Sequence, residues 1–230
     1  MMAYVIGVIS IIGTVLVYML ARMISRRFPS PFTLPVLIGT IIIISILFIF
    51  RIPYETYAFG AGWINHLLGP AVVALAYPLY KQWDMLRRNI VPILSGVLVG
   101  AVSGVASGLL LAKWAHIDEK IILSLTPKSV TTPVAMDIAH TIGGIPALAA
   151  VFVMFAGIGG AVLGPFVFKW TRIDHFLGKG IGIGCASHAI GIAQAMEHSE
   201  KEGAAGTVSM GLSSIVVSLA TQPLIWIIMQ

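Results

Sequence analysis

Residues 126–133, "TPKSVTTP", bring a lysine and four hydroxyl groups into an otherwise apolar part of the chain. Lys128 supplies a full positive charge, which favours hydrogen bonds to a carboxylate. The hydroxyl side chains add neutral donors: Thr126, Ser129, Thr131 and Thr132. Together these groups suit a small carboxylate. The alternative is an interfacial loop in which Lys128 extends to water and the hydroxyls only cap a helix.

Two Thr-Pro pairs in this stretch are candidates for the start of a half-helix. In Thr126-Pro127 and in Thr132-Pro133, a capping hydroxyl precedes a proline at the first helical position. A helix that begins at either pair directs its free N–H groups and its positive dipole end toward a bound anion. We therefore predict a half-helix that begins at one of the two pairs.

Two titratable side chains are candidates for binding a proton or a cation. Asp137 follows Pro133 by about one turn, so it either balances Lys128, binds a coupling cation or marks a helix end. His188 lies within the apolar stretch "GIGCASHAIGIAQAMEHSE", where an ionisable group is costly and its titration range suits a proton carrier. The alternative is a neutral histidine that donates to a backbone carbonyl. The neighbouring Ser187 is a further candidate donor to the substrate.

The elements that position these residues are membrane helices. Of 230 residues, 58% are hydrophobic and 10% charged, against about 25% charged residues in a soluble domain. Runs long enough to cross a bilayer recur along the chain: 3–20, 34–50, 63–80, 90–112, 146–168 and 206–228. Two further apolar runs, 121–144 and 180–196, are interrupted. The sequence predicts an all-α polytopic membrane protein in one integral membrane domain, residues 1–230. It has about seven to eight membrane segments, including one or two broken or re-entrant helices.

The distribution of lysine and arginine predicts that one segment is broken or re-entrant. Clusters at 22–27 and 81–88 both face the cytoplasm if two spans separate them. The cluster at 169–179 shares that side only if 121–144 does not cross the membrane fully. Non-helical backbone at membrane depth must be buried in protein or line a wet cavity. The interruption at 126–133 is therefore a candidate site.

A weak internal similarity suggests two structural repeats, about 1–112 and 113–230. "LGPAVVALAYPLY" (68–80) and "LTPKSVTTPVAMDI" (125–138) each precede a proline-led, glycine-rich span, a pattern typical of transporters built from repeats. Shared membrane composition is the alternative explanation. Residues expected to break helices or allow close packing are Pro70, Pro127, Pro133, Gly143, Gly144, Gly184 and Gly191. The four-residue spacing of glycines from 96 to 108 indicates helix packing.

Several other classes of function are disfavoured. The adjacent Ser187 and His188 point about 100° apart on a helix, which does not suit a nucleophile and its base. Cys185 and His188 provide too few ligands for zinc, and the single cysteine forms no internal disulfide. The net charge of +5 is explained by anchoring loops rather than by nucleic acid. We predict no enzyme activity, no metal and no cofactor.

The stretches 126–165 and 184–215, together with "LGPAVVALAYPLYKQ", closely resemble the LrgB/CidB family of bacterial inner-membrane proteins. The sequence is also similar to the C-terminal half of the plastid glycolate/glycerate translocator. The resemblance implies a multi-pass protein of the bacterial cytoplasmic membrane that works with a small LrgA/CidA-type membrane partner. It implies one of two functions: holin-like or antiholin-like control of murein hydrolase activity and autolysis, or transport of small carboxylates.

The residues favour transport, because a holin-like pore does not need a lysine and hydroxyl groups at a helix start. We expect a proton- or cation-coupled carrier of pyruvate-, glycolate- or glycerate-like monocarboxylates that influences lysis indirectly. Lys128 and its neighbouring hydroxyls bind the carboxylate in this hypothesis, and His188, with Asp137, couples transport. The alternative is a holin-like protein without a dedicated small-molecule substrate. A homodimer or higher homo-oligomer is compatible with the glycine stripe.

Overall fold

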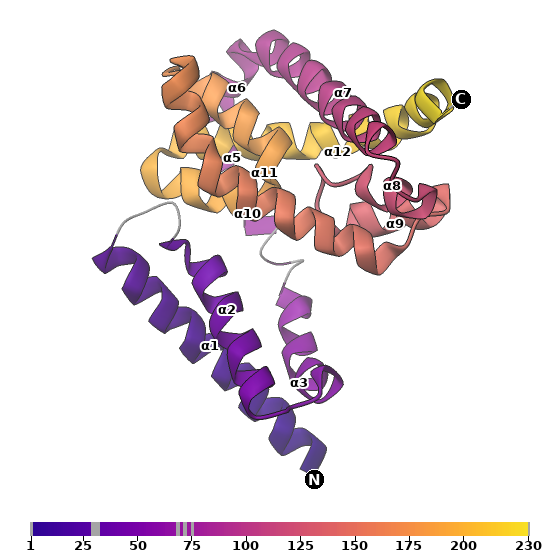
Figure 1. The fold of residues 1–230 in the computed structure, drawn as a ribbon. Coiled ribbons are helices and arrows are strands. Elements are labelled where there is room, and N and C mark those ends of the chain that lie inside the picture. Colours follow the sequence, from indigo (N-terminus) through magenta and orange to yellow (C-terminus); the bar gives the residue numbers. More distant parts are fainter. Residues whose placement is uncertain (1, 29–32, 68–69, 71–72, 75, 230) are drawn as a thin grey trace. The chain divides into compact units, whose positions relative to one another are not determined.

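A computed structural model describes residues 2–28, 33–67, 70, 73–74 and 76–229, and the regular elements in these ranges are all helices (Figure 1). Contacts divide the chain into two compact units, residues 1–77 and 78–230. Within 68–80, the first of the two stretches that suggested repeats, residues 68–69, 71–72 and 75 lie outside the described residues. The two repeats therefore stay a hypothesis.

The first unit is a small helical group in which α1 packs against α2 and α3. Close approach is possible because Gly7 and Gly60 bring the backbones of α1 and α3 into contact. A hydrogen bond of 2.9 Å joins the hydroxyls of Thr14 and Tyr57. The elements of this unit are α1 (Met2–Arg27), α2 (Pro35–Ile49), α3 (Tyr54–Ala61) and the 3-10 helix η2 (Gly62–Leu67).

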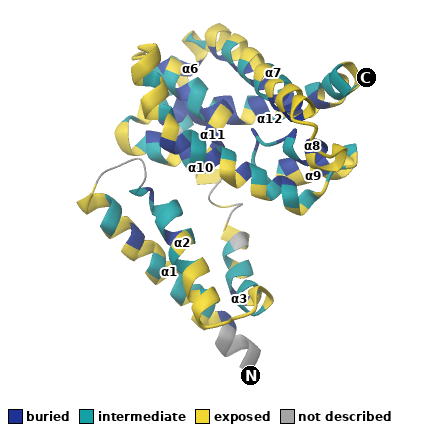
Figure 2. Ribbon diagram, viewed as in Figure 1, coloured by how far each residue is buried: buried dark blue, intermediate teal, exposed yellow. Residues whose placement is uncertain are grey.

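The second unit contains the predicted site. Its buried core lies where α7, α10, α11 and α12 pack together (Figure 2). Its helices, with α5 beginning just before the unit, are α5 (Ala76–Lys81), α6 (Trp83–Arg88), α7 (Ile90–Trp114), α8 (Glu119–Leu125), α9 (Thr132–Ile142), α10 (Pro146–Thr171), α11 (Phe176–His198) and α12 (Glu200–Met229).

Three helices of the second unit, α7, α10 and α12, run between its two ends. Lys81, just before α6, forms an ion pair of 3.2 Å with Glu200 at the start of α12. At the opposite end of α12, the Ile228 carbonyl accepts a hydrogen bond from Lys113 in the last turn of α7. We call the end at Glu200 the basic end, because the lysines and arginines of 81–88 and 169–179 lie there, and the end at Ile228 the far end.

Helix α11 turns back on itself instead of crossing the unit. His188 has non-helical backbone angles, φ 39° and ψ −136°. A Cβ placed on Gly191 would lie 2.7 Å from Ile183 Cγ2. In a continuous helix these two residues would be separated by a rise of about 12 Å, so the helix cannot be continuous between them. Gly180 in the first arm and Met196 in the second both contact the first turns of α12. The segment is therefore a re-entrant hairpin with both ends at the basic end.

Helices α8 and α9 form a second re-entrant segment, which starts and finishes at the far end. It follows the end of α7 directly, and the Ile145 N–H before α10 donates to Ser124 Oγ of α8 at 2.7 Å. Between the two helices, residues 126–131 are non-helical and reach the middle of α7. Because this segment does not cross, α10 brings the basic cluster 169–179 back to the end of the 81–88 cluster. The arrangement agrees with the charge distribution.

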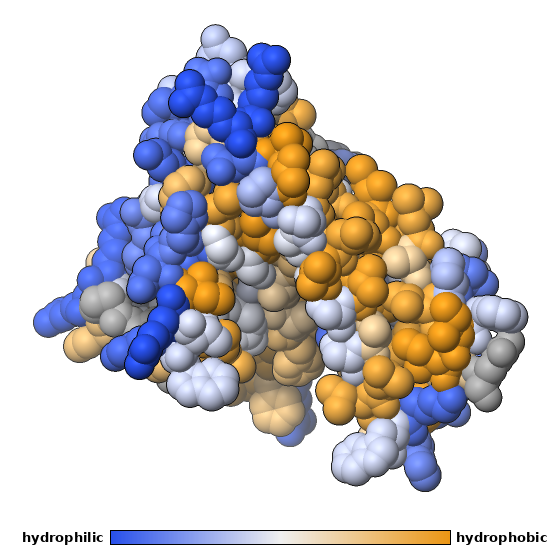
Figure 3. All heavy atoms as spheres, turned by 90° about the horizontal axis from the view of Figure 1, so that it is seen from above, coloured by the Kyte–Doolittle hydropathy of each residue, from blue (hydrophilic) through white to orange (hydrophobic). Residues whose placement is uncertain are grey.

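The chain is an all-helical membrane protein. Five helices within the described residues are long and apolar enough to cross a membrane: 7–27, 90–114, 146–171, 176–198 and 200–229. The fourth of these is α11, which folds back. Large apolar side chains cover much of the outer surface, and hydrophilic residues gather in separate patches (Figure 3). The predicted total of seven to eight membrane segments is not confirmed.

The re-entrant path of α11 predicts that residues on either side of it are accessible from the same face of the membrane. In a Cys185→Ser background, Arg172→Cys and Glu197→Cys should both react with a membrane-impermeant thiol reagent added to one face. Lys120→Cys, which follows Asp118 at the start of α8, should react only from the other face. Labelling of Arg172→Cys and Glu197→Cys from opposite faces would show that α11 spans.

Candidate functional site

A row of glycines on α7 receives both interrupted segments. Gly96 and Gly100 face Ile181 and Cys185 in the first arm of α11. The next two glycines of the row, at 104 and 108, face residues of the loop between α8 and α9. The interpretation of this row as helix packing is correct, but the row packs against two different segments. The loop after α8 and the first arm of α11 therefore pack along the same face of α7.

Lys128 lies against the last two glycines of this row. Its Nζ donates to the backbone oxygen of Gly104 at 2.9 Å, and a Cβ at Gly108 would lie 2.5 Å from the same nitrogen. In a helix the carbonyl oxygen of residue 104 accepts a hydrogen bond from the N–H of residue 108, and its second lone pair remains free. A side chain at 108 would cover that second lone pair. Glycine at 108 therefore gives the half-buried Lys128 its hydrogen-bond partner.

The half-helix predicted in this stretch begins at the second Thr-Pro pair. The N-cap position of α9 is Thr131 rather than the predicted Thr132, which is the first helical residue, with Pro133 after it in the first turn. The other assignment is wrong: Thr126 ends α8, and its hydroxyl donates to the Ile122 carbonyl at 2.8 Å. This bond occupies the Thr126 hydroxyl proton within its own helix.

The remaining donors of the loop lie close to Lys128 in sequence and differ in burial. Ser129 is buried with its hydroxyl against Gly104, while Thr131 and Thr132 are half-buried. The Thr131 hydroxyl makes no capping hydrogen bond. The first N–H groups of α9 have no partner inside the helix. The start of α9 thus retains the donor groups that an anion site requires.

His188 lies at the tip of the α11 hairpin. The sequence predicts it near the middle of a helix instead. Its side chain is 3% exposed, and Nε2 lies 3.2 Å from the Val153 carbonyl of α10. Gly157 makes room for the ring, because a Cβ there would overlap the imidazole carbon Cε1. The contact to a backbone carbonyl matches the alternative considered for this histidine. The same contact holds the turn of the hairpin against α10.

Ser187 and two serines of α12 carry buried hydroxyls without a hydrogen-bond partner among the described residues. Ser187 is 1% exposed and its hydroxyl touches Gly160 of α10. Ser209 lies against Gly184, and Ser213 lies near the Cys185 thiol. Buried hydroxyls are normally satisfied. The Cys185 thiol is a neighbour that can pair with Ser213, so Ser187 and Ser209 are the hydroxyls beside α11 that remain for a ligand or water.

The two interrupted segments meet on shared neighbours. Val130 of the loop is fully buried in a cluster with Val105 of α7, Val153 of α10 and Val217 of α12. The carbonyl of the same Val153 holds the His188 ring. The tips of the two re-entrant segments, which enter from opposite ends, are therefore joined through α7 and α10.

Other predicted residues lie outside this meeting point or serve packing. Asp137 is exposed on α9 and forms no ion pair with Lys128. Gly143 ends α9 with φ 88°, and Gly144 lies against the backbone of Ser124. Gly184 touches the Gly206 carbonyl of α12. Pro70 is exposed, and Pro127 is buried in the turn after α8.

The sequence alone did not single out Gly157, Gly160 or the two α12 serines as neighbours of the site. Gly157 lies against the His188 ring and Gly160 against the Ser187 hydroxyl. These two glycines share one helix face. A glycine pair three residues apart in a membrane helix is the signal that could have indicated close contact.

The chain is similar to several known proteins over nearly its whole length. The sequence pattern of the LrgB-like family matches residues 14–227. The uncharacterized protein YxaC of Bacillus subtilis is 48% identical over 96% of each chain, and YwbG of the same organism is 40% identical over 94% of this chain and 96% of its own. The holin-like protein CidB of Staphylococcus aureus is 34% identical over 96% of this chain and 97% of its own. No solved structure matches.

Packing around the His188 turn predicts that alanine substitutions at two glycines of α10 change the free energy of unfolding in opposite directions. Gly157→Ala should lower the free energy of unfolding by about 1–3 kcal/mol, because the added methyl group overlaps the His188 ring. Gly159→Ala is the matched control: a Cβ there meets nothing within 4 Å, and alanine favours helix by about 0.5–1 kcal/mol. Thermal unfolding in detergent measures both. Equal melting temperatures for the two variants would contradict the packing of His188 on α10.

Proposed function

The chain belongs to the LrgB-like family, and from the geometry of its two interrupted segments we propose that it carries small monocarboxylates across the membrane. Pyruvate, glycolate and glycerate are the substrate class that fits the donors. One observation carries the proposal: Lys128 lies beside the middle of α7 with a backbone carbonyl, not a carboxylate, as its partner. No ion pair to Lys128 forms among the described residues.

A charge in this position is costly unless another group neutralises it. Taking an ammonium group out of water costs several kcal/mol, and a single carbonyl compensates only part of that cost. A bound carboxylate would complete the compensation. It would also accept hydrogen bonds from Ser129, Thr131, Thr132 and the free N–H groups at the start of α9. The free N–H groups at the start of α9 and the unneutralised lysine therefore support the same ligand.

Coupling to protons is assigned in this proposal to His188. It is the titratable side chain at the second interruption, and its contact with Val153 ties its ring to the position of the α11 turn. A change in ring protonation would alter that hydrogen bond and so the hairpin. Asp137, exposed on α9, is a weaker companion, because nothing among the described residues pairs it with Lys128.

A holin-like function is the second candidate, because a relative 34% identical to this chain is named a holin-like protein. In that function the protein would permeabilise the membrane or control murein hydrolase release, alone as a homo-oligomer or with a small LrgA/CidA-type partner. Carboxylate flux could change lysis indirectly by altering envelope acidity. The two candidates differ in one measurable respect: a carrier is selective and saturable, and a lesion is neither.

The test is uptake of labelled pyruvate and glycolate into proteoliposomes that also contain a trapped inert dye. The wild-type protein should give saturable uptake that a pH gradient stimulates, while the dye stays inside. Lys128→Met should weaken substrate binding roughly 10- to 100-fold, as expected for the loss of a hydrogen bond to a charged group worth about 1.5–3 kcal/mol.

The matched control is Lys120→Met, which removes an exposed lysine from the same re-entrant segment. Its uptake should equal that of the wild type. Normal uptake by Lys128→Met would remove this residue from the site. Dye leakage without selective uptake would make the holin-like function primary. If neither signal appears, the assay should be repeated with the small partner co-reconstituted.

A further inference from the structure

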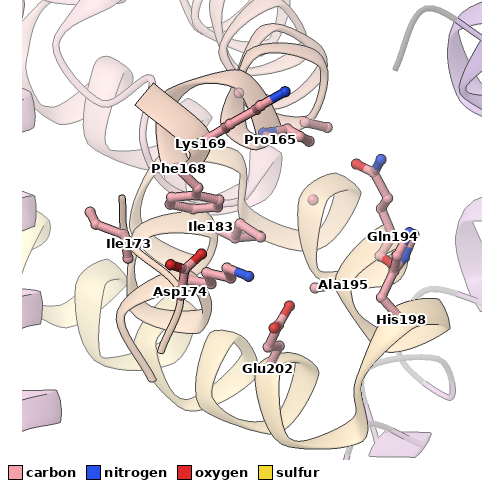
Figure 4. Close-up of a pocket in the computed structure, with 14 residues that line it drawn as sticks. Pro165, Phe168, Lys169, Ile173, Asp174, Ile183, Gln194, Ala195, His198 and Glu202 are labelled. Carbon is pink, nitrogen blue, oxygen red and sulfur yellow. The ribbon is translucent and has the colours of Figure 1, made fainter. Parts of the chain in front are cut away.

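A cavity of about 360 Å³ lies at the basic end of the second unit, separate from Lys128. Its walls come from the last turns of α10, from both arms of α11 and from the start of α12. Figure 4 shows Gln194 and His198 on one arm of the hairpin, across the cavity from Ile183 on the other. The turn at His188 therefore creates this cavity by placing the two arms of α11 side by side.

The inner end of the cavity reaches the hairpin turn. Gly160 and Gly191 line the cavity, and the side chain of Ser187 lies against both of them. The Ser187 hydroxyl is 1% exposed and has no hydrogen-bond partner among the described residues. Two glycines thus separate the cavity from an unsatisfied hydroxyl located next to His188. A small ligand that entered between the glycines would meet a polar group.

The outer part of the cavity carries charges of both signs, but the helix ends offset some of them. Asp174 precedes α11 and Glu202 lies in the first turn of α12, so each carboxylate is balanced by a positive helix end. Lys169 lies in the last turn of α10, where the negative helix end balances it. Lys179 lies in the first turn of α11, where the helix dipole opposes a cation.

Lys179 is therefore the charge in this cavity that its own helix does not stabilise. Neither it nor Lys169 forms an ion pair within the described part of the chain, in which Lys81 and Glu200 make the one ion pair found. Asp174 already offsets the N-terminal end of α11, so the amine of Lys179 is the source of a positive potential between the arms. That potential favours an anion between the arms of the hairpin.

We propose that this cavity is the basic-end vestibule of the carrier, in which a small carboxylate binds between the arms of α11 before it reaches the two interrupted segments. The inference rests on the proposed function and adds a second binding position to it. Lys179 holds the carboxylate, and the apolar walls at Phe168, Ile173 and Ile183 accept the short carbon chain. Ser187 is the next polar group on the way to His188.

The first test compares variants in pyruvate uptake from the basic face. Lys179→Met should raise the half-saturating pyruvate concentration about 10-fold, as expected for the loss of one charge-assisted contact. Lys201→Met is the matched control, because Lys201 is exposed at the same end, lies over the Phe176 ring and does not line the cavity. An unchanged half-saturating concentration in Lys179→Met would contradict the proposal that this cavity is a vestibule.

The second test measures binding without transport. In a Cys185→Ser background, pyruvate should slow modification of Gln194→Cys by a thiol reagent and should not affect Lys201→Cys. Protection at 194 supports the vestibule even if wild-type protein carries no pyruvate, in which case only the proposed function fails. The opposite result is uptake that depends on Lys128, with no protection at 194 and no effect of Lys179→Met. It would support the carrier function and contradict the assignment of this cavity as a vestibule.

Discussion

The structure of the second unit depends on one constraint: backbone groups that leave a helix inside a membrane need partners from the protein. Both interruptions meet this constraint on α7 and α10. The loop after α8 packs on the glycines of α7, and the tip of α11 packs on Val153 and Gly157 of α10. The small residues of the crossing helices thus provide the space that the two interrupted segments need.

The turn of α11 illustrates how this packing compensates backbone strain. His188 is one of four non-glycine residues with positive φ among the described residues, and the other three, Arg51, His116 and Arg172, are exposed. A buried residue in such a conformation costs about 1–3 kcal/mol and persists only when its surroundings fix it. The ring's contact with the Val153 carbonyl and the space above Gly157 provide that fixation. The strain is therefore concentrated where the hairpin would move.

The sequence predicted the first interruption better than the second, for a physical reason. Proline has a fixed φ and is favoured in the first turn of a helix, so the start of α9 could be predicted locally to within one residue. Thr126-Pro127 carried the same signal but ends a helix instead. The α11 run, 180–196, has no proline, so its glycine and polar residues indicated an interruption but not the position of a turn. Only contacts between distant residues, such as Gly191 with Ile183 and Gly206 with Ile192, reveal that the chain folds back.

The glycine row of α7 shows a similar limit. Its spacing predicted close packing, but two of its glycines face α11 and two face the loop after α8. Spacing alone could not show that half of the row supports Lys128. The spacing also could not indicate whether these glycines pack within one chain or between two copies of it. Within the second unit, all four glycines contact residues of the same chain.

The opposed entry of the two re-entrant segments bears on the choice between a carrier and a lesion. The loop between α8 and α9 enters from the far end and bonds to α7, and the tip of α11 enters from the basic end and bonds to α10. Movement of one segment would open the middle of the unit to one end while the other stayed closed, which is the requirement for alternating access. A lesion formed by several copies needs no such internal arrangement, and it gains nothing from burying a lysine against α7. The cost of holding Lys128 there is explained if a carboxylate neutralises it during each transport cycle.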